Sequence, residues 1–439
     1  MTDQSLLKGL KKRAVKVLKD NDTGNSTKPA PLLYPHQWNW DSAFIAIGLS
    51  HIDEERAQQE ILSLLRGQWT NGMIPHIIFN PHYAKYFPNP AFWNTSACFS
   101  GAPKTVQTSG ITQPPILASA TYAVFKNSSN KKKAIAFLKK VFPALKKYYS
   151  FFLTYRDPME EGLAYIIHPW ESGLDNSPRW DEVLSNIKMK WTPKYERVDN
   201  KIVSPEQRPG NQEYDKYTYL VELFRDVNYD SNRIWDENPF IVQPILFNCL
   251  LYESTQSLKE ICKILDEDTA EIEQWTLKIR NGINNKLWDK NLKMYCDFDL
   301  KNNRLIRKET IASFTPLYAG IPSQGIADLL VNTLTSPTQY WPTDGYPLTS
   351  VSMSAPEFDP KKYWRGPVWI NINWLMIKGL QRYGYYEESR HLIKKTIGLV
   401  LKSGFYEYFD PFTGKGYGSD KFSWSASLII DLLETYGEY

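Results

Sequence analysis

Apolar residues recur at helical spacing through most of this 439-residue chain, and that periodicity restricts its fold more than any other feature. Residues 269–287 are a clear case, because an apolar stripe runs from Ile272 to Leu287 and Asp268 stands where it can cap the helix. The pattern predicts about a dozen helices, so the expected class is all-α. The other predicted helices cover 1–20, 41–50, 53–66, 114–125, 133–154, 214–226, 239–252, 256–266, 323–335, 369–383, 386–402 and 421–436.

Long segments rich in proline, glycine and aromatic residues separate these helices. Loops of such length in a compact domain are usually functional or disordered, and an aromatic content of 14% argues against disorder. Short strand signals at 293–299 and 404–409 predict β-hairpins within the loops. The long loops are 67–113, 166–213, 336–368 and 403–420.

About a dozen helices with their loops on one side predict six helical hairpins in a ring, an (α/α)6 toroid. The absence of a fixed sequence period argues against an α-solenoid. No change of composition marks a linker, so residues 1–439 are expected to form a single domain. We expect loops 67–113, 166–213 and 336–368 to cap its functional site.

The sequence lacks the signatures of nucleotide, nucleic-acid and metal partners. It shows no βαβ alternation and no GxGxxG or GxxxxGKS/T motif. Its 52 basic and 48 acidic residues give a net charge of only +4, so a nucleic-acid partner is not expected. The four cysteines are scattered, with no CxxC and no histidine at metal-ligand spacing. Neither a disulfide framework, a metal nor a cofactor is therefore predicted.

The first twenty residues predict an amphipathic helix with a lysine-rich face. Such a helix can lie on a membrane surface, but its weak hydrophobicity favours a packed first helix with solvated lysines. It has neither the apolar core nor the cleavage site of a secretory signal, and no apolar run in the chain reaches membrane-spanning length. We therefore expect a cytoplasmic protein without a membrane partner.

Four segments combine acidic and aromatic side chains in loops or at helix starts: 34–41, 168–181, 363–371 and 404–411. Glycosidic cleavage needs one carboxylic acid to protonate the leaving oxygen, and a second carboxylate to activate water or to attack the anomeric carbon. Aromatic faces can stack on a sugar ring. Burial among them raises the pKa of a carboxyl group toward the range that a general acid requires.

Each of these acids also has a structural interpretation. Asp41 can cap the helix that follows it, and Glu171 and Asp175 can be solvated or capping residues. Glu407 can be a cross-strand ion-pair partner, and Asp410 before proline is typical of a turn. The single residues therefore leave the function open.

Taken in order, the segments resemble glycoside hydrolase family 63, in particular its small cytosolic branch of glucosylglycerate and mannosylglycerate hydrolases. The resemblance spans nearly the whole chain, and the joint occurrence of its motifs is highly specific. It implies an (α/α)6 toroid that hydrolyses its substrate with inversion. The motifs are YPHQWNWDSAF (34–44), NGMIPH (71–76), TQPP (112–115), HPWESGLDNSPRWD (168–181), EYDKY (213–217), YWRGPVWININWL (363–375), FYEYFDP (405–411) and FSWSAS (422–427).

By this resemblance, Asp175 is the general acid and Glu407 is the general base. Arg208 matches an arginine that binds the carboxylate of the aglycone, an alignment that rests mainly on its distance from EYDKY. Without the family, Arg208 is an ordinary solvated loop arginine. The resemblance assigns the rest of the substrate pocket to Tyr34, Trp38, Trp40, Asp41, Tyr86, Gln113, Tyr214, Tyr363, Trp364 and Trp369.

The sequence thus predicts an inverting α-glycosidase that hydrolyses glucosylglycerate, mannosylglycerate or both to hexose and D-glycerate. Its partner would be a small glycoside with a carboxylate aglycone, and a homo-oligomer is compatible with this activity. A trehalase-like enzyme for a neutral disaccharide is the main alternative, since YWRGPVWININW resembles trehalases too. A catalytically silent sugar-binding toroid is a weaker alternative, because Asp175 and Glu407 are both present. A sugar epimerase would need paired histidines that the pocket segments lack. Glucose or mannose preference stays open.

Overall fold

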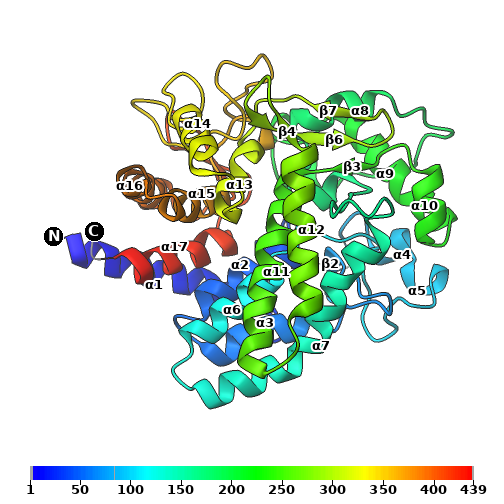
Figure 1. Ribbon diagram of the computed structural model, residues 1–439, viewed down its shortest axis with the longest axis horizontal. Coiled ribbons are helices and arrows are strands. Elements are labelled where there is room, and N and C mark those ends of the chain that lie inside the picture. Colours follow the sequence, from blue (N-terminus) through cyan, green and yellow to red (C-terminus); the bar gives the residue numbers. More distant parts are fainter. Residues whose placement is uncertain (1–2, 84, 438–439) are drawn as a thin grey trace.

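The computed structural model describes residues 3–83 and 85–437, and this part of the chain is mostly helical (Figure 1). The main helices are α1 (Asp3–Asp20), α2 (Asn39–Leu49), α3 (Glu54–Leu65), α6 (Leu117–Asn127), α7 (Lys131–Tyr155), α11 (Ile245–Leu265), α12 (Ala270–Lys286), α13 (Thr315–Ala319), α14 (Gln324–Leu334), α15 (Ile370–Arg382), α16 (Tyr386–Ser403) and α17 (Ser423–Tyr436). Shorter or loop-borne helices are α4 (Pro90–Trp93), α5 (Thr95–Cys98), α8 (Asp181–Ser185), α9 (Asn211–Asp226) and α10 (Ser231–Glu237).

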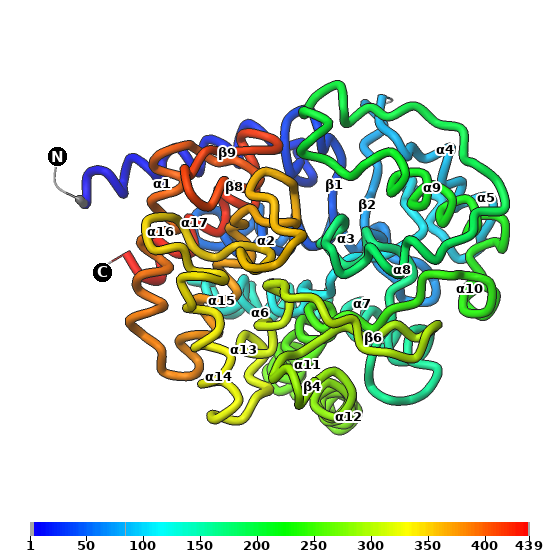
Figure 2. Tube along the Cα trace, turned by 90° about the horizontal axis from the view of Figure 1, so that it is seen from above, coloured from blue at the N-terminus to red at the C-terminus, as the bar shows by residue number. Residues whose placement is uncertain are grey.

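Six of these helices contact one another in a closed circuit. The contacts run from α2 to α6, α11, α13, α15 and α17, and α17 returns to α2. Further helices pack outside the circuit: α3 on α2, α7 on α6, α12 on α11, α16 on α15 and α1 on α17. In Figures 1 and 2 the C-terminal helix accordingly lies beside the N-terminal ones. The two ends of the chain therefore close the arrangement.

Amino-acid pattern distinguishes the helices of the circuit from those outside it. Every residue of α2 is buried, as expected for a helix that has neighbours on all sides. Helix α12 instead buries a stripe that includes Ile272, Ile279 and Ile283, and exposes its other face. The N-cap of α12 is Thr269, one residue after the predicted cap, but Asp268 still accepts a hydrogen bond from the backbone of Ala270 at 2.9 Å and so satisfies the first amide of the helix.

One long helix, α11, replaces the two helices predicted over 239–252 and 256–266. Polar residues interrupt the apolar pattern midway, but they are satisfied within the packed helices. The Thr255 hydroxyl donates to the Tyr252 carbonyl at 2.7 Å, and the Ser254 hydroxyl lies 3.0 Å from that of Ser119 on α6. The prediction of a break was therefore wrong.

Four small antiparallel sheets, with five strand pairs in all, lie in the loops of the described chain. They pair β1 (Gln37–Trp38) with β2 (Ile77–Ile78), β4 (Trp288–Asp289) with β5 (Met294–Tyr295), β8 (Tyr408–Phe409) with β9 (Gly416–Tyr417), and β6 (Asp297–Asp299) with both β3 (Val242–Gln243) and β7 (Arg304–Ile306). The hairpin predicted at 404–409 is thus confirmed at β8. The segment 293–299 instead holds two strands, β5 and β6, which belong to different ladders.

The N-terminal helix packs on the molecule, as the favoured interpretation of its pattern predicted. Leu10, Ala14 and Leu18 of α1 are buried, the helix contacts α17, and its lysines at 8, 12 and 16 are exposed. Within residues 3–83 and 85–437, no helix has both the length and the apolar character needed to cross a bilayer.

Candidate active site

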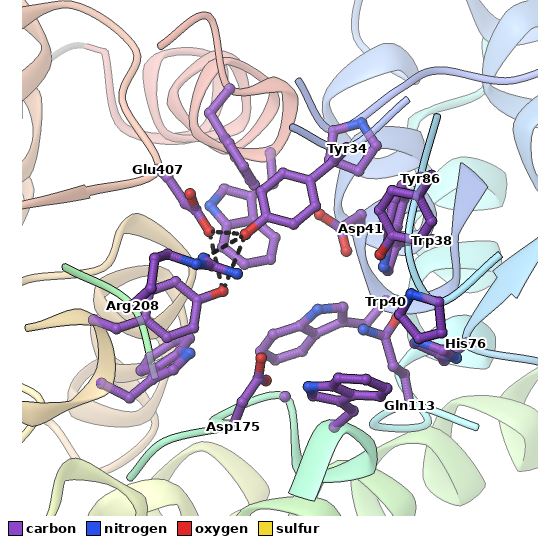
Figure 3. Close-up of a pocket in the computed structure, with 18 of the residues that line it drawn as sticks. Tyr34, Trp38, Trp40, Asp41, His76, Tyr86, Gln113, Asp175, Arg208 and Glu407 are labelled. Atoms are coloured by element: carbon purple, nitrogen blue, oxygen red, sulfur yellow. Dashed lines mark hydrogen bonds between the residues drawn. The ribbon is translucent and has the colours of Figure 1, made fainter. Parts of the chain in front are cut away.

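A small cavity of about 90 Å³ collects nearly all the side chains that the sequence singled out (Figure 3). The lining comes from three of the predicted long loops, 67–113, 166–213 and 336–368. It is completed by residues 29–41 up to the first turn of α2, by Tyr214 on α9, by Glu407 before β8 and by the start of α17. The predicted residues on its wall are Tyr34, Trp38, Trp40, Asp41, Tyr86, Gln113, Asp175, Arg208, Tyr214, Tyr363, Trp364 and Glu407.

Glu407 lies in the bend directly before β8, and its carboxylate is almost fully hydrogen-bonded. Its Oε1 accepts from the hydroxyls of Tyr34 (2.8 Å) and Tyr363 (3.1 Å), and its Oε2 accepts from the backbone of Ser419 (3.2 Å). Burial raises the pKa of Glu407, while the charge of Arg208 and these hydrogen bonds act to lower it. The group is therefore fixed in position as an acceptor, which rules out the cross-strand ion pair.

Asp175 lies in a turn between two 3₁₀ helices, and it points into the cavity from the side facing Glu407 (Figure 3). The hydroxyl of Tyr217 donates to its carbonyl at 2.8 Å, and Asn176 accepts from the backbone of Trp364 at 3.0 Å. Burial raises the pKa of Asp175 to about 7; Arg208 opposes this shift and the charge of Glu407 adds to it. A carboxyl group with this pKa can hold a proton near neutral pH.

A buried ion pair braces the loop that carries Asp175. Glu171 is fully buried, not solvated, and accepts two hydrogen bonds of 2.9 Å from the guanidinium of Arg156. It also accepts from the backbone amides of Thr112 (3.0 Å) and Ile167 (2.8 Å). The pair therefore ties the Asp175 loop to the segment that carries Gln113.

The start of α2 forms another wall. Asp41 lies in the first turn of this helix, whose N-cap is Trp38, so the capping interpretation of Asp41 is wrong. Burial, followed by repulsion from Glu407 and Asp175, raises the pKa of Asp41 well above its ordinary value. The side chain of Gln113 accepts from the backbone of Trp40 at 3.2 Å.

Arg208 is buried, contrary to the solvated alternative, with 8% of its surface exposed. Its Nη1 donates to the Tyr34 hydroxyl at 3.0 Å, its Nε donates to Asp199 at 3.2 Å, and its guanidinium lies over the ring of Tyr363 at 4.7 Å. No hydrogen bond within the described part of the chain uses its Nη2. A chain of polar contacts thus links Arg208 through Tyr34 to Glu407.

The remaining predicted walls are aromatic. Tyr86 meets Trp38 edge to face, with ring centroids 5.7 Å apart. Tyr214 lies under the guanidinium of Arg197 at 4.4 Å, and its hydroxyl donates to the Phe87 carbonyl at 3.4 Å.

Trp369 does not line the cavity, which corrects its predicted place on the wall. Its ring stacks flat on Trp364 with centroids 3.6 Å apart, and Trp364 thereby covers it. Its indole N–H donates to the carbonyl of Tyr363 at 3.1 Å. Trp369 therefore supports the two neighbouring wall residues from behind.

Besides Pro29, Pro88 and Gly173, the residue-by-residue prediction missed four side chains on the wall: His76, Trp170, Phe422 and Trp424. All four belong to the motifs given above, so the signal was present but was not resolved to single positions. Burial lowers the pKa of His76 well below its usual value, which keeps the ring neutral. The indole N–H of Trp424 is buried and has no acceptor among the described residues.

The wall offers carboxyl, amide and aromatic groups rather than a metal centre. Across residues 3–83 and 85–437, no group of three or more His, Cys, Asp and Glu side chains is arranged to hold a metal ion. Asp175 and Glu407 are carboxyl groups on one wall, and carboxyl groups are among the side chains that transfer protons to or from a bound molecule.

Comparison with known proteins gives a consistent family. Residues 34–425 match the mannosylglycerate hydrolase MGH1-like glycoside hydrolase domain. The mannosylglycerate hydrolase of Rubrobacter radiotolerans is 42% identical over 96% of both chains, and the glucosylglycerate hydrolase of Mycolicibacterium hassiacum is 37% identical over 96% of this chain and 97% of its own. A crystal structure of the family 63 mannosylglycerate hydrolase from Thermus thermophilus, in complex with Tris and D-glycerate, matches with a TM-score of 0.91. It is 41% identical and covers 96% of this chain and 99% of that one. The chain therefore belongs to the mannosylglycerate hydrolase MGH1-like branch of glycoside hydrolase family 63, and it is a glycoside hydrolase.

Proposed function

We propose that this enzyme hydrolyses the bond between a hexose and D-glycerate, in glucosylglycerate, mannosylglycerate or both. The observation that carries the proposal is the buried guanidinium of Arg208 on the wall that also holds Glu407 and Asp175. A guanidinium binds a carboxylate with paired hydrogen bonds, and glycerate supplies one. The mannosylglycerate and glucosylglycerate hydrolases among its relatives, and the D-glycerate bound in the Thermus structure, support the same substrate class.

The reaction follows from two carboxyl groups in different protonation states. The acid form of Asp175 gives its proton to the glycosidic oxygen as the bond from that oxygen to the anomeric carbon breaks, and glycerate leaves. The carboxylate of Glu407 takes a proton from a water molecule whose oxygen attacks the anomeric carbon from the opposite face. We infer inversion at that carbon. Solvent then returns a proton to Asp175 and removes the one on Glu407.

The other wall residues divide between the sugar and the aglycone. We assign Trp38, Trp40, Asp41 and Gln113 to the hexose, because they surround the start of α2 away from Arg208. The unpaired indole N–H of Trp424 is a further donor for a sugar hydroxyl. Tyr86, Tyr214, Tyr363 and Trp364 would enclose the glycerate end with Arg208.

We also propose an (α/α)6 toroid as the architecture behind this site. The closed circuit of α2, α6, α11, α13, α15 and α17 would be its inner ring, with α3, α7, α12, α16 and α1 outside. Helix α14, which follows α13 in the chain, would be the sixth outer helix. Residues 1–439 would then form one catalytic domain, capped by loops 67–113, 166–213 and 336–368.

The test is an end-point sugar-release assay of the purified protein on four substrates. These are glucosylglycerate, mannosylglycerate, the neutral glycerol glycoside and trehalose. Release from the two glycerates alone is the expected result, and it would rank the two hexoses directly. Comparable release from trehalose or from the neutral glycoside would contradict recognition of the carboxylate and favour a trehalase-like enzyme.

A further inference from the structure

A second cavity, of about 540 Å³, lies at the other end of the helical circuit from the catalytic pocket. Helices α2 and α17 begin at the catalytic pocket with Asp41 and Trp424, and farther along they border the second cavity with Ile47 and Asp431. All six helices of the circuit contribute to its wall. We call it the base cavity. Its volume lies in the range of ordinary small-molecule sites, roughly 300–1,000 Å³.

The wall of the base cavity is charged, although it belongs to the inner helices of the molecule. On α15, Trp374, Lys378 and Arg382 are spaced four residues apart, so they share one face of the helix and all three border the cavity. Charged groups on an inward face need either partners or water. The partners decide which groups remain available to a ligand.

Each of the three carboxylates on the wall already has a hydrogen-bonding or ionic partner. Glu253 accepts from Arg382 at 2.7 and 3.0 Å, and Glu260 pairs with Lys263 at 2.7 Å. Asp431 accepts from the ring of His51 at 2.8 Å and from the indole of Trp374 at 2.7 Å. The acidic side of the cavity is therefore already engaged.

Four basic groups border the cavity: Lys126, Lys259, Lys378 and Arg382. Lys126 and Lys378 are the two that lie near each other and are weakly paired. Lys378 approaches Asp431 only at 3.8 Å and otherwise lies over the Trp374 ring at 4.4 Å. The ammonium of Lys126 lies over the ring of Tyr122 at 4.9 Å, and no carboxylate of the described chain pairs with it. Loss of hydration and repulsion by Lys378 lower the pKa of Lys126. The charges of Asp431 and Glu253 act in the opposite direction on the pKa of Lys126. Two like charges thus face one cavity, and Asp431, already hydrogen-bonded to His51 and Trp374, is the counter-ion they share.

The walls between the lysines suit an organic molecule rather than a bare ion. Trp374 and Tyr318 offer aromatic surface, and Ser119 and Ser257 offer hydroxyl groups. Ammonium groups act as point charges for phosphate or carboxylate. A hydroxylated body with one acidic group therefore matches both parts of the wall.

We propose that the base cavity is a second ligand site, which binds a small hydroxylated organic anion by placing its phosphate or carboxylate group between Lys126 and Lys378. The site is separate from the catalytic pocket and does not depend on the proposed substrate. The ammonium groups of the two lysines can bind the anionic oxygens of either a phosphate or a carboxylate. The test therefore includes both kinds of anion.

The test is isothermal titration of the full-length protein with D-glucose 6-phosphate, D-gluconate and inorganic phosphate, at constant ionic strength set by sodium chloride. D-Glucose is the neutral control ligand. We expect saturable binding of at least one organic anion, and at least tenfold weaker binding in Lys126→Gln and in Lys378→Gln. Lys140→Gln, an exposed lysine on α7 outside the cavity, should bind as the unchanged protein does.

Three results would overturn the proposal. One is the absence of saturable binding for all the anions. Another is binding that both lysine variants retain but Arg208→Ala loses, which would place the anion in the catalytic pocket. The third is equal binding of glucose and glucose 6-phosphate, since the lysines would then contribute nothing. Failure of the sugar-release assay would leave these outcomes unaffected, so the two proposals are tested independently.

Discussion

Three carboxyl groups and one guanidinium share the wall of a single small pocket, and their positions decide which group carries a proton. Glu407 has two tyrosine hydroxyls and a backbone amide as donors, so its ionised form is stabilised. Asp175 has no comparable set of donors, and its pKa rises to about 7. Different surroundings thus separate a base from an acid with the same chemistry.

The pH dependence of kcat/KM should show both groups. Catalysis needs the protonated form of Asp175, so activity should fall as the pH rises through about 7. It also needs ionised Glu407, whose pKa is raised from its ordinary value, so activity should fall again on the acidic side. A full profile on the best substrate measures both limbs. Activity that stays constant from pH 6 to 9 would exclude Asp175 as the acid.

The same shift predicts that Asp175→Asn is an inactive but more stable enzyme. Below the unfolded-state pKa, about 3.9, the carboxyl group is protonated in both states and costs nothing. As the pH rises toward about 7, only the unfolded chain loses its proton freely, so the folded state is progressively destabilised. Asparagine avoids this cost. We expect a gain on the order of 1–4 kcal/mol at pH 8 and a smaller one at pH 5. Thermal melts at both pH values measure it, and an equal effect at both would contradict the assignment.

Arg208 should affect substrate binding and the base at once. In Arg208→Gln, we expect KM for the glycerate substrate to rise roughly 10–100-fold, since a charged hydrogen-bond donor is lost. The acidic limb of the pH profile should also move upward, because Arg208 lowers the pKa of Glu407. Arg208→Lys is the control: it keeps the charge but not the paired geometry, so KM should rise without the shift of the limb. An acidic limb that moves equally in Arg208→Gln and Arg208→Lys would show that the charge of Arg208 does not set the pKa of Glu407.

For single residues, the sequence could predict the residue types and motifs of the site. It could not predict which side chain of a motif lines the pocket and which one lies behind it. Trp364 and Trp369 belong to one motif, and only the fold determines that the first covers the second. Likewise, Trp424 belongs to a recognisable motif, but its unpaired N–H is a property of the packed structure. Motif spacing carries no information on burial of single atoms.

At the scale of elements, the Arg156–Glu171 pair connects the end of α7 to the loop of the general acid. Glu171 receives donors from three different segments, so its removal would leave several buried groups without a partner. No sequence signal identifies this pair. Arg156 and Glu171 lie at the two ends of a loop, and the sequence does not show that this loop folds back to bring them together. For that reason the sequence alone left a solvated or capping role open for Glu171.

Breaking this pair from either side should destabilise the protein and slow catalysis. Arg156→Met and Glu171→Gln are each expected to cost about 3–5 kcal/mol, because a buried charge loses its partner. We expect kcat to fall on the order of 10–100-fold as Asp175 loses its support, with a smaller change in KM. Chemical denaturation and steady-state kinetics measure the two effects.

A double variant and an exposed ion pair serve as controls for that prediction. The combined change Arg156→Met with Glu171→Gln should cost clearly less than the sum of the single changes. Lys146→Gln breaks an exposed pair with Glu271, at 2.8 Å, and should change stability by less than about 1 kcal/mol. Additive losses in the double variant would show that the two residues act separately.

For the whole molecule, the closing contact joins residues that are 379 positions apart in the sequence. The Ser427 hydroxyl of α17 accepts from the backbone of Gly48 on α2 at 3.0 Å. Periodicity predicted most of the helices, because the apolar spacing that indicates a helix lies within the helical segment itself. It could not fix their order around the circuit, because helical spacing alone is shared by rings and solenoids.

The seam between α2 and α17 should tolerate no additional atom at Gly48. A Cβ at this position would overlap the side chain and backbone of Ser427, so Gly48→Ala should destabilise the protein by about 1–3 kcal/mol. Gly9→Ala is the matched control: it is also within a helix, α1, but a Cβ there meets nothing within 4 Å. That change should stabilise by up to about 1 kcal/mol, because alanine favours helix more than glycine does. Denaturant unfolding of both variants measures the difference. Equal gains in both would show that the first and last parts of the circuit do not form a tight seam.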